Sequence, residues 1–196
     1  IGMLAFRLES GRELWVIILF HITGTAMELF KTDVGSWSYG GEGVLRIGAV
    51  PLFSGFMYAA VGSYMVRVYR LHDLRFARYP RIWLTTIIAT LIYINFFSHH
   101  YIWDLRWILL VSVALIWGPT VMYFRVWRVT LKVPLLLVFA GVALFIWIAE
   151  NIATWGGAWL YPNQTDGWEL VSPQKLIAWF LLMIISVVMV TWVYPP

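Results

Sequence analysis

The sequence has 196 residues, of which 61% are hydrophobic and 12% are charged, with a formal net charge of +4. A soluble domain carries about 25% charged residues, so this chain cannot cover its surface with charge, which excludes an ordinary soluble protein. Thirteen Trp and ten Tyr are typical of the aromatic belts at membrane interfaces. Without any Cys, the sequence also excludes disulfides and thiolate chemistry.

Six stretches of the sequence are apolar enough to be membrane spans, each of which needs about 20 residues as a helix. In chain order they are 13–31, 45–67, 82–99, 108–124, 133–151 and 173–194. We therefore predict an all-α membrane protein with about six transmembrane helices. The whole chain, 1–196, is expected to form a single transmembrane helical domain.

Charged residues divide unevenly between the two sides that this topology defines. With the adjoining span ends included, the side with the N-terminus, 68–81 and 125–132 has ten basic and three acidic residues. Counted in the same way, the side with 32–44, 100–107 and 152–172 has four basic and seven acidic residues. Because cytoplasmic loops are rich in Lys and Arg, the first side is predicted to be cytoplasmic. The basic loops are thus explained by topology, and the expected partners are membrane lipids, with no nucleic acid.

Two strings in the sequence, ELFKTDVGSWSYG at 28–40 and ENIATWGGAWLYP at 150–162, share a pattern at a spacing of 122 residues. Self-similarity at a fixed spacing indicates a structural repeat, with copies at about 13–67 and 133–194. Both copies run in the same direction through the membrane, so they are predicted to be parallel. The matched pairs are Glu28 with Glu150, Thr32 with Thr154, Gly35 with Gly157, Trp37 with Trp159, Tyr39 with Tyr161 and Pro51 with Pro173.

The aromatic residues of the repeated string have two interpretations. In the first, they lie at the membrane interface, while Gly and Pro shape an outer hairpin. In the second, they bind a substrate. The candidate substrate-binding residues are Trp37, Tyr39, Trp159, Tyr161 and Asp104.

Glu28 and Glu150 are the first candidates for catalysis. An ionisable group within a span indicates a functional site, although near a span end it can instead extend to water. His21 lies seven residues before Glu28, nearly two helical turns, so both are predicted on one helix face. His99 ends the third span and His100 follows it, at the same membrane face as the Glu residues. The Glu residues are candidate general acids or bases, with the His residues positioning or transferring protons.

Metal and cofactor remain unknown from the sequence. His and carboxylate ligands together suit Zn, Fe or Mn, but no HExxH spacing is present. The sequence also contains no phosphate-binding Gly loop, dinucleotide fingerprint or nucleophile elbow.

Five stretches of the sequence are typical of one family: ELFKTDVGSWSYG, VPLFSGFMYAAVGSY, NFFSHHYIWDLRW, FIWIAENIATWGGAWLYPNQ and WFLLMIISVVMV. Through them nearly the whole chain resembles a YoaT-like family of uncharacterised bacterial integral membrane proteins. That resemblance implies a multi-pass protein of the bacterial inner (cytoplasmic) membrane with a cytoplasmic N-terminus, and it implies no activity. Family motifs often continue with Pro after the position of Tyr39, where this chain has Gly40.

A weaker likeness is to carotenoid-modifying membrane proteins of the lycopene-cyclase type, which also have an aromatic W-x-Y-like turn followed by Pro and a span. Their acidic residues directly after that Pro are missing here, where Pro51 precedes Leu52 and Pro173 precedes Gln174. The likeness implies a similar architecture and an apolar substrate.

Two functional hypotheses follow. The first is a membrane enzyme acting on an apolar isoprenoid or lipid substrate at the outer face. The second is a non-enzymatic membrane protein, namely a transporter, a ligand-binding protein or an accessory subunit with a protein partner in a membrane complex. Polar groups gathered at one face favour an enzyme or a binding protein over a channel.

Overall fold

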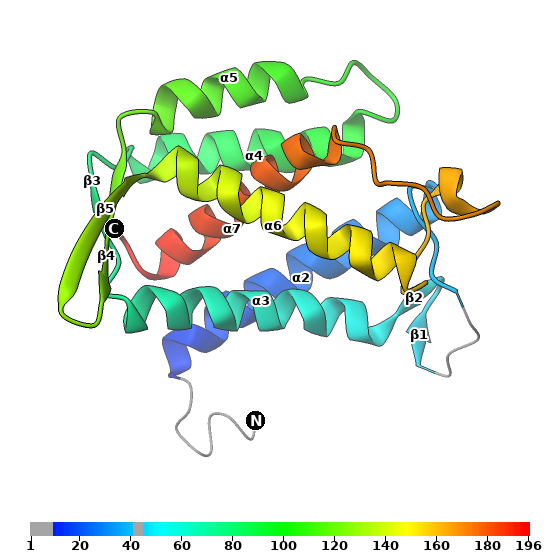
Figure 1. The fold of residues 1–196 in the computed structure, drawn as a ribbon, viewed down its shortest axis with the longest axis horizontal. Helices are drawn as coiled ribbons and strands as arrows, with labels where there is room; N and C mark the ends of the chain where they lie inside the picture. Colours follow the sequence, from blue (N-terminus) through cyan, green and yellow to red (C-terminus); the bar gives the residue numbers. More distant parts are fainter. Residues whose placement is uncertain (1–9, 41–44) are drawn as a thin grey trace.

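A computed structural model describes residues 10–40 and 45–196 of the chain. Over these residues the protein is mostly helical, and its α-helices lie side by side along the long axis (Figure 1). The prediction of a helical protein is therefore confirmed. The helices are α2 (Gly11–Asp33), α3 (Leu52–Leu71), α4 (Ile82–Ser98), α5 (Arg106–Trp117), α6 (Leu135–Trp155) and α7 (Lys175–Val193).

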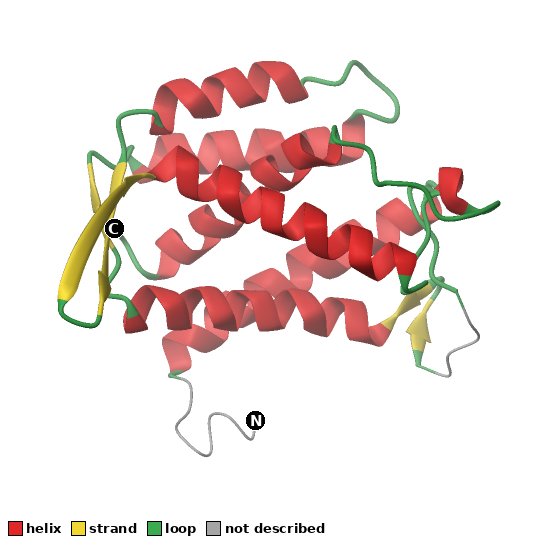
Figure 2. Cartoon of the chain, in the orientation of Figure 1, coloured by secondary structure: helices red, strands yellow, loops and turns green. Residues whose placement is uncertain are grey.

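Short strands occupy both ends of the helical bundle (Figure 2). At one end β1 (Arg46–Ile47) pairs antiparallel with β2 (Val50–Pro51). At the other end an antiparallel sheet has the order β3-β4-β5, and Val126 pairs with Val129 to close the β4–β5 hairpin. The strands of this sheet are β3 (Arg75–Ala77), β4 (Val121–Val126) and β5 (Val129–Pro134), and one 3₁₀ turn, η1, covers Pro162–Gln164.

Two of the predicted spans are wrong at one end. The predicted span 45–67 begins with the β1–β2 hairpin, and its helix starts only after Pro51. The predicted span 108–124 ends as a helix at Trp117, because Pro119 follows directly after Gly118 and cannot continue a helix. The apolar residues that follow form β4 and pair with β5 instead.

Three of the described helices, α2, α6 and α7, are long and apolar enough to cross a membrane. The helices α4 and α5 are apolar but shorter. With 12 residues at about 1.5 Å each, α5 is roughly 18 Å long, less than the hydrocarbon core of about 30 Å. The helices are therefore of a membrane-protein type, with α5 shorter than the sequence predicts.

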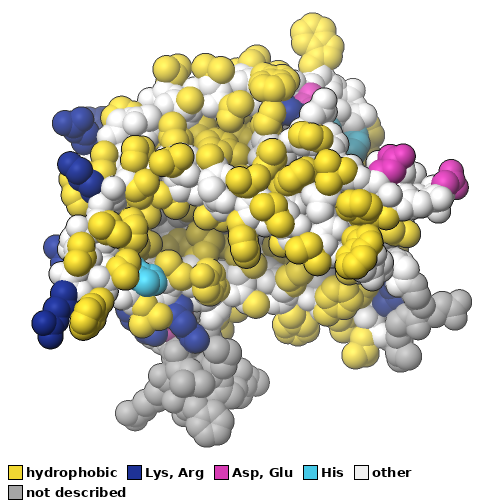
Figure 3. All heavy atoms as spheres, in the orientation of Figure 1, with side chains coloured by type: hydrophobic (Ala, Val, Ile, Leu, Met, Phe, Trp, Pro, Cys, Tyr) yellow, Lys and Arg dark blue, Asp and Glu magenta, His cyan; other side chains and the backbone are white. Residues whose placement is uncertain are grey.

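Helix α7 lies at the centre of the bundle. It contacts α2, α3, α4, α5 and α6, and it is buried on several sides, as expected for a helix that is apolar all round. In contrast, the outward faces of α5 and α6 expose large apolar side chains such as Leu115 and Phe145. Figure 3 shows this apolar belt across the middle of the molecule.

Charged side chains gather at the two ends of the bundle. In Figure 3 most Lys and Arg side chains lie at the end with β3, β4 and β5, whereas Asp and Glu side chains mark the opposite end. Apart from His21, in the middle of α2, the functional candidates lie at this opposite end, where the turns after α2, α4 and α6 meet.

Candidate functional site

The turns that follow α2 and α6 have the same backbone geometry. Gly35 and Gly157 have φ values of +70° and +72°, in the left-handed region that favours glycine. The Gly35 N–H donates to the carbonyl of Thr32, and the Gly157 N–H donates to the carbonyl of Thr154. Each turn therefore reverses the chain in the same way directly after its helix.

These two turns contact each other through their backbones. Ser38 and Leu160 form an antiparallel bridge in which each N–H donates to the other's carbonyl at 3.0 Å. The two residues are 122 positions apart, the spacing of the repeated string. This bridge brings the ends of α2 and α6 together, and with them Glu28 and Glu150.

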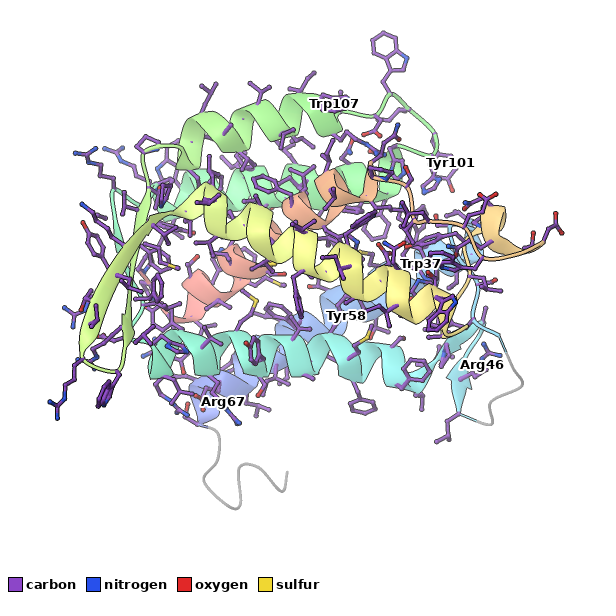
Figure 4. All side chains as sticks on the ribbon, in the orientation of Figure 1. Trp37, Arg46, Tyr58, Arg67, Tyr101 and Trp107 are labelled. Atoms are coloured by element: carbon purple, nitrogen blue, oxygen red, sulfur yellow. The ribbon has the colours of Figure 1, made fainter. Side chains whose placement is uncertain are left out.

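Glu28 is buried, with 3% of its surface exposed, so it does not extend to water. Its Oε2 accepts hydrogen bonds from Trp37 Nε1 at 3.0 Å and from the Tyr39 hydroxyl at 2.8 Å. Its Oε1 accepts one from the Tyr58 hydroxyl on α3 at 2.9 Å. Figure 4 labels Trp37 and Tyr58 in the half of the bundle that carries the turns.

Glu150 is equally buried and has a similar arrangement of donors. The Tyr161 hydroxyl donates to Oε1, and Trp179 Nε1 on α7 donates to Oε2 at 2.7 Å. Both carboxylates are thus held by one donor or more from their own turn and by one from the next helix of the hairpin.

The tyrosine donors in the turns stay protonated. Burial raises the pKa of Tyr39 and of Tyr161 far above the ordinary value, and the charge of the neighbouring Glu28 or Glu150 raises it further. Neither hydroxyl can therefore act as a base near neutral pH, and both remain hydrogen-bond donors.

A cavity of about 90 Å³, which we call the acid cavity, is lined by both Glu28 and Glu150. Its other walls are mostly aromatic and aliphatic side chains from α2, α3, α4, α7 and the two turns. Four of the predicted substrate-binding residues are among them, namely Trp37, Tyr39, Trp159 and Tyr161.

His21 lies outside the acid cavity. Its ring packs against Phe56 of α3 at a centroid distance of 5.3 Å, and it lies so close to Gly55 that a Cβ there would be 2.8 Å from Cε1. Within the described residues, its buried Nδ1 has no hydrogen-bond partner. The helix therefore directs His21 toward α3, whereas Glu28 points into the acid cavity.

His99 and His100 line a second cavity of about 310 Å³, which we call the vestibule. The vestibule adjoins the acid cavity, since Trp37 and Lys175 line both. The Nε2 atom of His100 lies 2.9 Å from the Nζ atom of Lys31.

Burial lowers the pKa of His99 and of His100, and the positive charge of Lys31 lowers both further. The two rings are therefore neutral near pH 7, which leaves a ring nitrogen of His100 free to accept a hydrogen bond from the Lys31 ammonium group.

Asp104 lies outside both cavities. It forms an ion pair with Arg106 at 2.5 Å and accepts a hydrogen bond from Asn95 at 3.1 Å. Burial would raise the pKa of Asp104, but the bonds from Asn95 and Arg106 outweigh it and hold the pKa below its ordinary value. Here Asp104 orients Arg106, which itself lines the vestibule.

Several residues of the site are absent from the sequence-based candidates. The repeat spacing does not reveal Tyr58 and Trp179, because they are 121 rather than 122 positions apart. Two cations of the vestibule lie within quoted motifs, one in ELFKTDVGSWSYG and one in NFFSHHYIWDLRW, but only the fold shows that they face one cavity with the third. These cations are Lys31, Arg106 and Lys175.

Over residues 10–40 and 45–196, no group of three or more His, Cys, Asp or Glu side chains is placed to hold a metal ion. The candidate histidines and the two candidate catalytic carboxylates are divided between the vestibule, the acid cavity and the α2–α3 contact, and Asp104 lies outside all three.

Comparisons with known proteins place this site on a recognised fold. The crystal structure of a mycobacterial Insig homolog, MvINS from Mycobacterium vanbaalenii, matches with a TM-score of 0.64 and 12% identity. The match covers 96% of this chain and 97% of that one. A cross-linked trimer of an MvINS variant matches over the same shares with the same TM-score, at 11% identity. These likenesses show the fold alone.

Sequence comparison shows the family. The uncharacterized protein YoaT of Bacillus subtilis (strain 168) is 46% identical over 183 residues, which are 93% of this chain and 69% of that protein. The predicted YoaT-like resemblance is thus confirmed. A family model described as a protein of unknown function (DUF817) matches residues 1–187, and the chain belongs to that family.

Proposed function

We propose that the chain is a multi-pass protein of the bacterial inner membrane with a cytoplasmic N-terminus. The apolar belt and the gathering of Lys and Arg at the β3–β5 end support this orientation. In this arrangement the short helix α5, together with the extended chain leading into β4, completes one passage. The turns after α2 and α6 then lie at the outer face.

Within this protein, α2–α3 and α6–α7 are two parallel copies of one duplicated hairpin. The matched φ values of Gly35 and Gly157, and the bridge between Ser38 and Leu160, support this proposal. Each copy contributes one buried carboxylate to the common cavity.

The function that the geometry favours is binding of an apolar lipid or isoprenoid in the cavity lined by Glu28 and Glu150, with its polar end toward the outer face. The observation that carries this proposal is that the two buried carboxylates line one cavity. Below it, an apolar cavity of about 40 Å³ between α2, α3, α4 and α7 shares Met27, Tyr58 and Leu182 with the acid cavity. The shared residues mark the direction in which the proposed apolar chain runs between the helices.

An enzyme acting on the same class of molecule is the second candidate, with Glu28 or Glu150 as general acid or base. It is favoured by the common cavity, since paired carboxylates can divide acid and base roles. However, each carboxylate oxygen already accepts a hydrogen bond from the protein. The three candidate histidines lie outside the acid cavity, two in the vestibule and one against α3. A ligand-binding protein therefore fits the geometry better than a catalyst.

Lipid analysis of the purified protein tests this proposal. The full chain is purified from its native membrane, and extracted lipids are compared by mass spectrometry between the wild type, Glu28→Gln and the double variant Glu28→Gln/Glu150→Gln. We expect a co-purifying lipid or isoprenoid in the wild type that is depleted in both variants. The exposed Asp166→Asn is the matched control and should retain it.

Identical lipid profiles from the wild type and from both variants, all of them monodisperse in detergent, would contradict the binding proposal. Recovery of a chemically altered ligand from the wild type, with unaltered ligand in Glu28→Gln, would instead support the enzyme.

A further inference from the structure

The vestibule gathers positive charge on one side of the acid cavity. It is lined by Lys31, Arg106 and Lys175 together with His99 and His100, and no Asp or Glu is among its lining residues within the described chain. Three cations that face one cavity repel each other, which costs free energy unless an anion lies between them.

Of these groups, Lys31 has the greatest need of a counter-charge, since only 4% of its surface is exposed. Its Nζ contacts neutral groups, namely His100 Nε2 at 2.9 Å and the ring of Phe96 at 5.7 Å. Among the described residues no carboxylate lies within 4.0 Å of Lys31 or Lys175, whereas Arg106 pairs with Asp104. A buried ammonium group ordinarily needs a counter-charge.

Two helix N-termini add to this positive potential. Arg106 and Lys175 are the first residues of α5 and α7. A helix N-terminus carries a partial positive charge, which disfavours a cation and favours an anion. Lys175 also lies over the ring of Tyr161, at 4.1 Å, so its charge stands at the boundary between the vestibule and the acid cavity.

We propose that the vestibule binds the phosphate group of a phosphorylated amphiphile whose apolar chain passes through the acid cavity into the bundle. This inference rests on the proposed function, because it names the head group of the same apolar ligand. A phosphate monoester carries about −1.5 to −2 charges near pH 7, which matches three surrounding cations better than a single carboxylate does. The Arg106 guanidinium supplies a planar pair of donors, and the two lysines supply point charges.

A binding experiment with the purified full chain in uncharged detergent tests this proposal. The probes are farnesyl phosphate, farnesol and inorganic phosphate, and the readout is tryptophan fluorescence, since Trp37 lines both cavities. We expect farnesyl phosphate to bind at least about tenfold more tightly than farnesol. Inorganic phosphate should bind more weakly than farnesyl phosphate, because it has no apolar chain to bury.

Substitutions in the vestibule then separate charge from folding. Arg106→Gln, which changes a residue of the vestibule alone, should weaken farnesyl phosphate binding about tenfold or more, with farnesol binding unchanged. Lys175→Gln changes a residue that lines both cavities and should weaken farnesyl phosphate binding more than farnesol binding. Arg106→Lys keeps the charge and should restore most of the affinity. Arg128→Gln, at the opposite end of the bundle, is the matched control and should bind all three probes as the wild type does.

Equal affinity for farnesyl phosphate and farnesol would overturn the phosphate proposal and leave the proposed lipid-binding function standing. If neither farnesyl probe binds, the phosphate proposal is contradicted, whereas the proposed lipid-binding function is decided by the lipid analysis described above. If inorganic phosphate binds as tightly as farnesyl phosphate, the vestibule is a site for free phosphate, and the amphiphile is contradicted.

Discussion

The turns after α2 and α6 have the same backbone but different surroundings. Among the described residues, three side chains donate to Glu28 and two donate to Glu150. The donor from the second helix is Tyr58 in one hairpin and Trp179 in the other. The comparison indicates that the backbone frame and the buried carboxylate are common to both turns, while the donors that hold each carboxylate differ.

A second difference lies in charge. The position that corresponds to Lys31 in the second turn is Ala153, 122 residues later. The hydroxyl of Thr154 there accepts a hydrogen bond from Trp168 at 3.1 Å. At this position of the repeat, only the end of α2 contributes a Lys to the vestibule. Each copy of the repeat thus contributes one carboxylate to the acid cavity, but only the first copy contributes a positive charge at this position to the adjoining vestibule.

The largest expected effect is the loss of a carboxylate. Glu28→Ala leaves three buried donors without an acceptor, and Glu150→Ala leaves two. Since each unsatisfied buried donor costs about 1–3 kcal/mol, Glu28→Ala should lower the free energy of unfolding by about 3 kcal/mol or more, and Glu150→Ala by less. Unfolding in detergent micelles measures both, with the exposed Asp166→Ala as control.

Equal losses in the two variants would mean that the number of donors does not determine the cost. Such a result would remove the difference in hydrogen bonding that distinguishes the two turns.

A smaller effect is expected from Tyr58→Phe, which removes one donor to Glu28 and keeps the ring. A hydrogen bond to a charged group contributes about 1.5–3 kcal/mol, so the free energy of unfolding should fall by roughly that amount. Tyr64→Phe, on an exposed part of the same helix, should change it by less than about 0.5 kcal/mol. If both variants unfold alike, the Tyr58–Glu28 bond does not stabilise the protein.

The common backbone can be tested at its two left-handed glycines. Gly35→Ala and Gly157→Ala introduce a Cβ into open space, so their cost is conformational, about 1–2 kcal/mol each. Because the φ values are nearly identical, the two losses should be equal. Gly40→Ala also meets open space, without a positive φ, and serves as control. Unequal losses would show that the turns differ in backbone strain as well as in side chains.

The smallest effect concerns pH. Because the pKa of His99 and of His100 is lower in the folded protein than the ordinary value of about 6.5, the unfolded chain binds more protons as the medium becomes acidic. The contribution of these two histidines to the free energy of unfolding is therefore fully present above about pH 6.5. As the pH drops below that value, the free energy of unfolding should fall.

The charged groups that face these histidines are Lys31 from α2, Arg106 from α5, Lys175 from α7 and Asp104 from the loop before α5. Replacing one ring in His100→Gln should reduce the loss of stability between about pH 7 and pH 5. The control Arg128→Gln, at the opposite end of the bundle, changes no group that titrates between about pH 5 and pH 7 and should leave that pH dependence as in the wild type. A steeper loss in His100→Gln would reverse the predicted sign.

The sequence allows the helical fold and the family to be predicted, because long apolar runs and characteristic strings can be recognised without knowing which segments pack together. It does not reveal β4, whose apolar residues resemble the continuation of a helix. A short apolar run cannot be assigned to helix or strand by periodicity, and here pairing with β5 decides. The β1–β2 hairpin is missed for the same reason.

The site is predictable only in part. The repeat predicts that Glu28 and Glu150 lie near each other, and both line the acid cavity. His21 shares a helix with Glu28, but its direction depends on the packing of α3 at Gly55, which the sequence of α2 does not contain. The pairing of Lys31 with His100 joins residues 69 positions apart and follows from the fold alone.

The central position of α7 also bears on how the protein is made. A ribosome completes α2 to α6 before α7 exists, yet α7 is the helix that contacts all five of them. During synthesis, the faces of the earlier helices that contact α7 therefore have no packing partner until α7 is made. We expect the α2–α3 hairpin to assemble early, since Gly24 lies directly against Tyr58 and Gly62 against Phe20. The wall of the acid cavity at Trp179 is therefore completed only when α7 is in place.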